Sequence, residues 1–178
     1  MFRRLRKLFR KKPPVEKNFS SRFDARSEKN IATLNSEVQP TFRKLTAIAK
    51  RTAARYGCEA KVISGHRTYE EQAELYAKGR TAPGPRVTNA RPGYSNHNFG
   101  VAVDFGIFSE GDYLDGKQPG LTKKIYRIIN NVAETEGLNV EWGGSWKGGF
   151  VDPPHFEYIT PWTLAEMRDR TARGLTIV

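Results

Sequence analysis

Apolar residues recur at helical spacing in two long stretches of the chain. In residues 38–57 the apolar positions share one face, and Gly57 ends the pattern. Residues 121–136 show the same spacing, with Gly137 as the terminator. Each pattern predicts an amphipathic helix whose apolar face belongs to the core.

Two further helices are predicted from the residues at their ends. Thr68 and Glu71 fit a capping box, and Gly79 suits the end of the helix that follows. A Thr-Pro pair at residues 160–161 predicts the start of a last helix, which runs to about residue 174.

Short apolar runs with strand character separate these helices. They are residues 61–63, 101–105, 140–142 and 156–159. Residues 79–96 are rich in glycine and proline and predict a long loop, which in a compact domain is often functional. The expected fold is α+β: a single compact domain with a small antiparallel sheet flanked by helices, and with polar motifs at the strand ends.

Length and composition fit one soluble globular domain. The chain has 178 residues, and its 38% hydrophobic content is enough to form a core. No run approaches the roughly 18 apolar residues of a membrane span, and the N-terminus lacks the apolar stretch of a signal peptide. The single cysteine, Cys58, cannot form an internal disulfide and is interpreted as a small buried hydrophobe.

Positive charge is concentrated at the N-terminus. Residues 1–17 hold eight lysines or arginines and one acid, and therefore seven of the eleven net positive charges. In residues 1–12 the apolar positions recur every three or four residues, as in a basic amphipathic helix on an anionic surface; a disordered basic tail fits equally well. We divide the chain into a basic segment with a Pro-Pro linker, residues 1–24, and a globular domain, residues 25–178. The domain carries little net charge and no nucleic-acid motif, so no specific nucleic-acid partner is expected.

Two of the three histidines stand near carboxylates in a way that indicates a metal site. His97 precedes an apolar strand with one carboxylate, Asp104, and burying a carboxylate is costly unless it is paired or metal-bound. His155 follows Asp152 and two prolines, which fix the chain in an extended turn. Two imidazoles and a carboxylate are ligand types of catalytic zinc, which keeps a fourth position for water. His66 is not needed for this set.

Two charged residues are candidates for catalysis. Asp152, near the metal but not bound to it, can take a proton from water and pass it to a leaving amine. Arg67, just after the first strand, can stabilise an oxyanion or pair with a substrate carboxylate.

The polar motifs also follow a family pattern: Ser-x-His-x-x-Gly-x-Ala-x-Asp, followed by an acidic residue three positions before a second histidine. The chain matches this pattern at Ser95, His97, Gly100, Ala102, Asp104, Asp152 and His155. Over about residues 25–160 it resembles the zinc D-alanyl-D-alanine metallopeptidases and L-alanyl-D-glutamate endopeptidases. The resemblance implies a fold like that of these peptidases and of hedgehog domains. It further implies one zinc ion held by His97, Asp104 and His155, with Asp152 as general base and acid and Arg67 steadying the polarised carbonyl.

Other positions near the motifs have two interpretations each. Gln72 matches a recurrent family position, for which a structural or a substrate-side role is expected. Ser95 is either a polar loop residue or one that orients a ligand. Trp142 and Trp146 are core or rim aromatics, or stack on substrate. Ser145 stands where the family has Asp, a departure that concerns the choice of bond.

The implied reaction is hydrolysis of the peptidoglycan stem peptide. Residues 142–147 resemble the endolysin-like branch, which favours the L-Ala-D-Glu bond. The alternatives are a D-alanyl-D-alanine carboxypeptidase and a zinc-bearing binding module without catalysis. The presence of Asp152 and Arg67 argues against the binding module, because a protein without catalysis would need neither. A monomer is expected. If phage-encoded, it would stay in the cytoplasm until release and then act in the periplasm or cell wall, where residues 1–17 would bind the anionic envelope.

Overall fold

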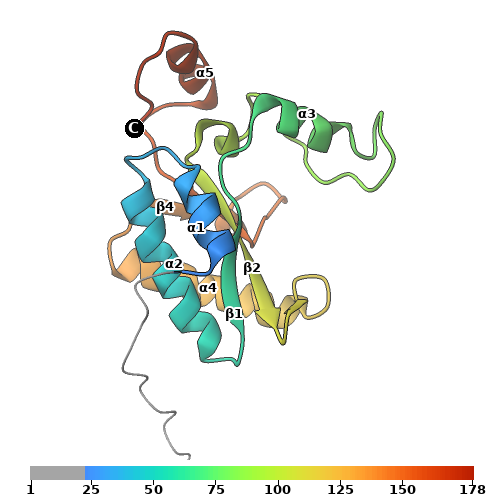
Figure 1. Ribbon diagram of the computed structural model, residues 1–178, viewed down its shortest axis with the longest axis vertical. Helices are drawn as coiled ribbons and strands as arrows, with labels where there is room; N and C mark the ends of the chain where they lie inside the picture. Colours follow the sequence, from blue (N-terminus) through green and yellow to red (C-terminus); the bar gives the residue numbers. More distant parts are fainter. Residues whose placement is uncertain (1–22) are drawn as a thin grey trace, which may run out of the picture.

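Residues 23–178, which are the residues that the computed structural model describes, fold into helices and short strands (Figure 1). The helices are α1 (Ala25–Ala32), α2 (Gln39–Ala54), α3 (Tyr69–Ala77), α4 (Pro119–Thr135) and α5 (Leu164–Ala172). The strands are β1 (Glu59–Ser64), β2 (Ala102–Ser109), β3 (Asp112–Tyr113), β4 (Val140–Trp142) and β5 (His155–Tyr158). Two 3-10 helices are η1 (Asn96–Phe99) and η2 (Gly143–Ser145). The two interpretations of residues 1–12, a basic amphipathic helix and a disordered basic tail, concern residues outside those described.

The strands form one antiparallel sheet in the order β1-β2-β5-β4, and β3 pairs with the end of β2. In this register Asp104 of β2 lies directly opposite Ser64 of β1 on one side and His155 of β5 on the other. Residues directly opposite each other share a face of the sheet. The register therefore sets Ser64, Asp104 and His155 in one row. The predicted α+β fold with a small antiparallel sheet is confirmed.

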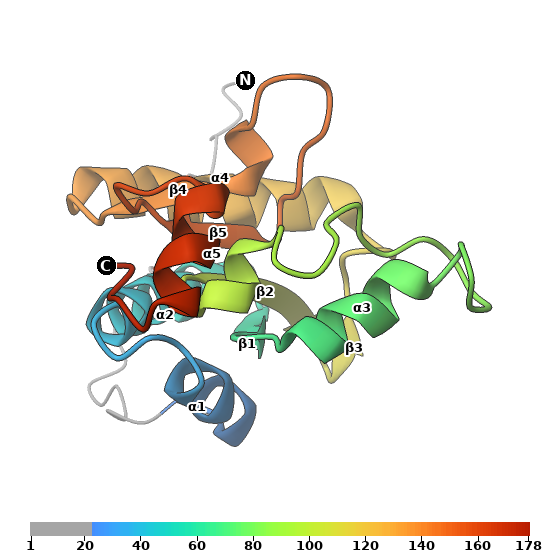
Figure 2. The ribbon, with the colours of Figure 1, turned by 90° about the horizontal axis from the view of Figure 1, so that it is seen from above.

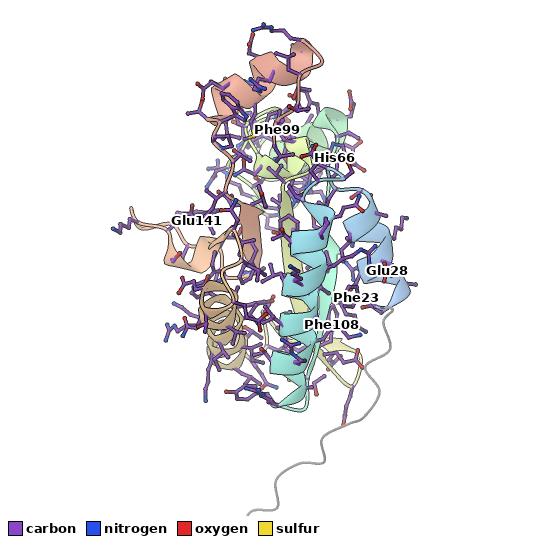
Figure 3. All side chains as sticks on the ribbon, turned by 90° about the vertical axis from the view of Figure 1, so that its left-hand side faces the viewer. Phe23, Glu28, His66, Phe99, Phe108 and Glu141 are labelled. Atoms are coloured by element: carbon purple, nitrogen blue, oxygen red, sulfur yellow. The ribbon has the colours of Figure 1, made fainter. Side chains whose placement is uncertain are left out.

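The main core lies where α1, α2 and α4 pack on the sheet. Figure 3 shows α2 between α1 and α4, with strands behind it. Phe42 of α2 and Phe105 of β2 are fully buried, and Tyr126 of α4 donates a hydrogen bond to the Phe105 carbonyl at 2.9 Å. Cys58 is buried, as predicted. None of the helices in the described part of the chain is both long and apolar enough to cross a bilayer.

The remaining helices lie at the end of the sheet where β1 ends and β2 begins. Figures 1 and 2 show α3 and α5 at this end, with η1 between them. The loop between β4 and β5 extends away from the sheet in Figure 2. These segments surround the row of polar residues that the strand register creates.

The structure corrects two expectations about helices. Helix α1 was not predicted because its buried residues are only Ser27 and Ile31, too few for an apolar stripe. Ser27 is buried because its hydroxyl accepts a hydrogen bond from the Val62 amide of β1 at 2.9 Å. The last helix begins after Thr163 and not at the Thr-Pro pair, because Thr163 and Glu166 form a complete capping box. The capping box predicted at Thr68 is confirmed.

Candidate metal centre and active-site cleft

Three elements bring the predicted metal ligands together. His97 lies in η1, Asp104 in β2, and His155 is the first residue of β5. Gly100, with φ +65°, ends η1 and turns the chain into β2. A Cβ atom at Gly100 would come within 2.8 Å of the Asn35 amide nitrogen, so this turn requires glycine.

The three ligand atoms form a nearly equilateral triangle. His97 Nε2 is 3.3 Å from Asp104 Oδ1 and 3.3 Å from His155 Nδ1. His155 Nδ1 is 3.1 Å from Asp104 Oδ1. A tetrahedral site with bonds of about 2.0 Å has edges of about 3.3 Å, so the triangle has the dimensions of one face of a zinc tetrahedron. Among residues 23–178 this is the one group of three or more His, Cys, Asp or Glu side chains with such spacing.

The second nitrogen of each imidazole is hydrogen-bonded away from the triangle. His97 Nδ1 is 2.7 Å from the Gly65 carbonyl, which can only accept, so Nδ1 carries the proton. His155 Nε2 is 2.9 Å from Glu157 Oε2. When both rings are neutral, the lone pairs of the other two nitrogens face each other and Asp104, and a metal cation between them would satisfy all three atoms. The donor types, spacing and tautomers therefore fit a zinc ion.

The acid-base properties of the ligands follow from this close contact. Burial by itself raises the pKa of Asp104, but the charge of His97 and the hydrogen bonds from both imidazoles outweigh burial and hold the pKa well below its usual range. Burial by itself lowers the pKa of His155, but hydrogen bonds to Asp104 and Glu157 raise it to about 10. Protons and metal therefore compete for His155 at neutral pH.

Protein stripped of metal with a chelator is expected to lose stability as the pH rises from about 6.5 to 10. The folded pKa of His155, about 10, lies above the unfolded value of about 6.5. Its contribution is fully present below about 6.5 and is lost as the pH rises through about 10. Thermal unfolding midpoints measured in chelator at several pH values test this. A His155→Gln variant should decline less over the same range; an equal decline would contradict the assignment.

Asp152 lines the same cavity as the three ligands of the triangle. Its amide donates to the Gly143 carbonyl at 2.9 Å, and a Cβ atom at Gly143 would come within 2.6 Å of the Asp152 carbonyl oxygen. Glycine is therefore required for this approach. Within the described residues the Asp152 carboxylate has no hydrogen bond or ion pair. Burial and the charge of Asp104 raise its pKa, which favours proton uptake.

Arg67 reaches the same site from the segment after β1. Its Nη2 is 3.6 Å from Asp104 Oδ2 and donates to Ser64 Oγ at 3.1 Å, while Nη1 donates to Gln72 Oε1 at 2.8 Å. Gln72 is fully buried, and its Nε2 donates to the Ala90 carbonyl at 2.7 Å. Gln72 thus links the guanidinium to the loop after α3 and has no surface for substrate.

A cleft of about 540 Å³ opens over these groups. Its lining includes Arg67, Val87, Tyr94, Ser95, Asn96, His97, Asp104, Trp146, Phe150, Asp152, His155 and Glu157. The structure thus brings the predicted ligands, base and arginine into one cavity. Ser95 lines the cleft, but its side chain makes no hydrogen bond to a ligand within the described residues. Ser145 is exposed and donates to the Trp142 carbonyl, and His66 lies outside the cleft.

The two predicted tryptophans have different environments. Trp142 is 5% exposed, stacks on Phe156 in the core and donates from Nε1 to the Pro153 carbonyl at 2.7 Å. This hydrogen bond stabilises the turn that precedes His155. Trp146 lines the cleft, with its ring centroid 5.2 Å from that of His155.

Several residues of the cleft were not identified from the sequence, and three of them lie next to the predicted groups. Glu157 and Asn96 contact each other beside His155, and Phe150, 58% exposed, stacks on Trp146 at the cleft mouth. A signal for Glu157 was present, because residues two apart on a strand share a face and Glu157 is two after His155. Neither Asn96 nor Phe150 has a comparable signal in the sequence.

Comparison with known proteins finds peptidases among the relatives of this chain. A family model described as D-alanyl-D-alanine carboxypeptidase matches residues 88–158. The chain is 38% identical over 130 residues to the peptidoglycan L-alanyl-D-glutamate endopeptidase CwlK of Bacillus subtilis (strain 168), covering 70% of this chain and 75% of that protein. It is 28% identical over 134 residues to VanXYC of Enterococcus gallinarum, a bifunctional D-Ala-D-Ala dipeptidase and carboxypeptidase, covering 65% and 69% of the two chains.

A solved structure shares the fold as well. The L-Ala D-Glu endopeptidase ChiX of Serratia marcescens superposes with a TM-score of 0.50 and 26% identity, covering 77% of this chain and 89% of that one. The chain belongs to the peptidase family that contains the L-alanyl-D-glutamate endopeptidases and the D-alanyl-D-alanine carboxypeptidases.

Proposed function

We propose that this protein is a zinc-dependent peptidoglycan peptidase that hydrolyses the L-alanyl-D-glutamate bond of the stem peptide. The observation that carries the proposal is the zinc-sized triangle of His97, Asp104 and His155 with the carboxylate of Asp152 in the same cleft. Both CwlK and ChiX are L-alanyl-D-glutamate endopeptidases, which favours this bond.

The cleft residues can perform the steps of amide hydrolysis. His97, Asp104 and His155 would hold the zinc ion, which would supply Lewis acidity and lower the pKa of water. Asp152, whose pKa is raised by burial and by Asp104, takes the proton of the attacking water and delivers it to the leaving amine. Arg67 presents a fixed guanidinium to the negative charge that develops on the carbonyl oxygen.

A second candidate is a D-alanyl-D-alanine carboxypeptidase. The family model and the similarity to VanXYC support it, and Arg67 is a cation in the cleft that could pair with a terminal carboxylate. The two candidate activities use the same zinc chemistry and differ in which peptide bond of the substrate is hydrolysed.

Digestion of purified peptidoglycan by the full chain, analysed by mass spectrometry, tests the proposal. We expect fragments with a new amino-terminal glutamate, loss of cleavage with chelator, and recovery when zinc is added back. Release of single D-alanine residues with the rest of the peptide intact would replace the proposal by the carboxypeptidase. Absence of any cleavage by zinc-loaded protein would indicate a binding module.

Residues 1–17 lie outside the described residues, and their role stays a prediction from the sequence. Their excess of positive charge suits binding to the anionic cell envelope. On this proposal the protein acts in the periplasm or cell wall and, if phage-encoded, waits in the cytoplasm until release.

A further inference from the structure

Glu157 contacts His155 on the side of the ring that faces away from the metal triangle. His155 Nδ1 lies in the triangle, and Nε2 is 2.9 Å from Glu157 Oε2. The same carboxylate oxygen accepts a hydrogen bond from Asn96 Nδ2 at 2.6 Å. Asn96 directly precedes His97, so one carboxylate links the segments that carry both histidines.

The strand register places a second carboxylate next to Glu157. Glu157 lies opposite Ala102 of β2 and opposite Glu141 of β4, and such pairs share a face of the sheet. Like charges in this position destabilise a sheet. Glu141 is exposed to solvent, whereas the side chain of Glu157 is only 18% exposed. The partial burial of the Glu157 carboxylate is compensated by the hydrogen bonds that it accepts from His155 and Asn96.

We propose that Glu157 is a positioning residue of the zinc site: held by Asn96, it fixes the ring of His155 so that Nδ1 points at the metal. A carboxylate can only accept from the imidazole, so the proton stays on Nε2 and the Nδ1 lone pair is free. Such a partner also increases the basicity of the ligand. This inference rests on the proposed zinc dependence.

The effect on zinc affinity is the main test. Wild-type protein and the Glu157→Ala and Glu157→Gln variants are titrated with zinc in competition with a chromophoric chelator at fixed pH. We expect Glu157→Ala to raise the zinc dissociation constant about 10- to 100-fold. Glu157→Gln should have a smaller effect, because an amide oxygen still accepts from Nε2 but carries no charge. Asn96→Ala, which keeps the carboxylate but removes one of its anchors, should also weaken binding.

Glu141→Gln is the matched control, because it removes the same charge from the directly opposite position without contacting a histidine. It should leave zinc affinity unchanged. Equal weakening by Glu141→Gln would overturn the inference in favour of a general electrostatic effect. Unaltered zinc affinity in both Glu157 variants would also overturn it. In assays of peptidoglycan hydrolysis, a change confined to the KM of these variants would overturn it as well, because it would make Glu157 a substrate contact.

Two further measurements separate this role from other failures. Thermal unfolding in chelator reports folding alone; if Glu157→Ala does not fold, Glu157→Gln and Asn96→Ala carry the test. The absorption spectrum of the cobalt-loaded variants reports the ligand geometry directly. If wild-type protein does not bind zinc, both this inference and the proposed function fail; if it binds tightly and the variants bind equally tightly, only this inference fails.

Discussion

Replacing Asp152 with Asn is expected to lower kcat for peptidoglycan hydrolysis by about 10³-fold while zinc stays bound. General acid-base groups typically contribute 10²- to 10⁴-fold. Asp152 is not part of the ligand triangle, and its carboxylate has no hydrogen bond or ion pair among the described residues. Removing its charge therefore leaves the ligands in place and removes only the group that exchanges protons with water and the leaving amine. Mass-spectrometric product assays and measurements of bound zinc on the same samples test both parts.

Asp112→Asn provides the control for this substitution. Asp112 is exposed on β3 and pairs with Lys117 at the surface, so the same change there should leave hydrolysis intact. If Asp152→Asn retained wild-type kcat, Asp152 would not be the base. If it lost zinc, its role would be that of a ligand.

Replacing His97 with Ala is expected to abolish both zinc binding and hydrolysis. His97 is 3% exposed and supplies one corner of the triangle, and its loss leaves only two ligands. The zinc dissociation constant should rise by more than the 10- to 100-fold typical of losing the partner of a ligand. Zinc content after dialysis and product formation at added zinc measure the effect.

The chain contains its own control in His66, an exposed histidine outside the cleft. His66→Ala should keep wild-type zinc content and activity. Because His97→Ala also leaves the Gly65 carbonyl without its donor, circular dichroism must establish that the variant is folded. Asp104→Asn, which nearly preserves shape, should weaken zinc binding in the same direction. Full zinc content in both variants would exclude this triangle as the metal site.

Local signals in the sequence were sufficient for most elements. The capping box of α3 and the stripes of α2 and α4 involve residues within a few positions of one another, so periodicity and end signals reveal them. The prediction for the start of α5 was wrong, because the helix begins at the capping box of Thr163 and Glu166 and not at the Thr-Pro pair. Helix α1 had too weak an apolar stripe, because one of its two buried residues is Ser27, whose hydroxyl accepts from the Val62 amide of β1 and donates to Asp24 at the start of the helix.

The candidate metal ligands were also predictable, because a lone carboxylate in an apolar strand and a histidine after two prolines are local anomalies. What the sequence by itself determined is thus the type of each chemical group and the local element that carries it. Which of these groups come into contact was decided by the tertiary structure alone. Asp104 and His155 are neighbours because β2 and β5 pair in one register, although 51 positions separate them along the chain.

The alternation of side chains along β5 puts Glu157 on the same face as His155, and packing separates Trp142, in the core, from Trp146, on the cleft wall. Gln72 proved to be a buried link between Arg67 and a loop and not a surface for substrate. Side chains that are distant in sequence are oriented by the packing of strands and helices in a common core. No local sequence pattern determines which atoms of such side chains come into contact.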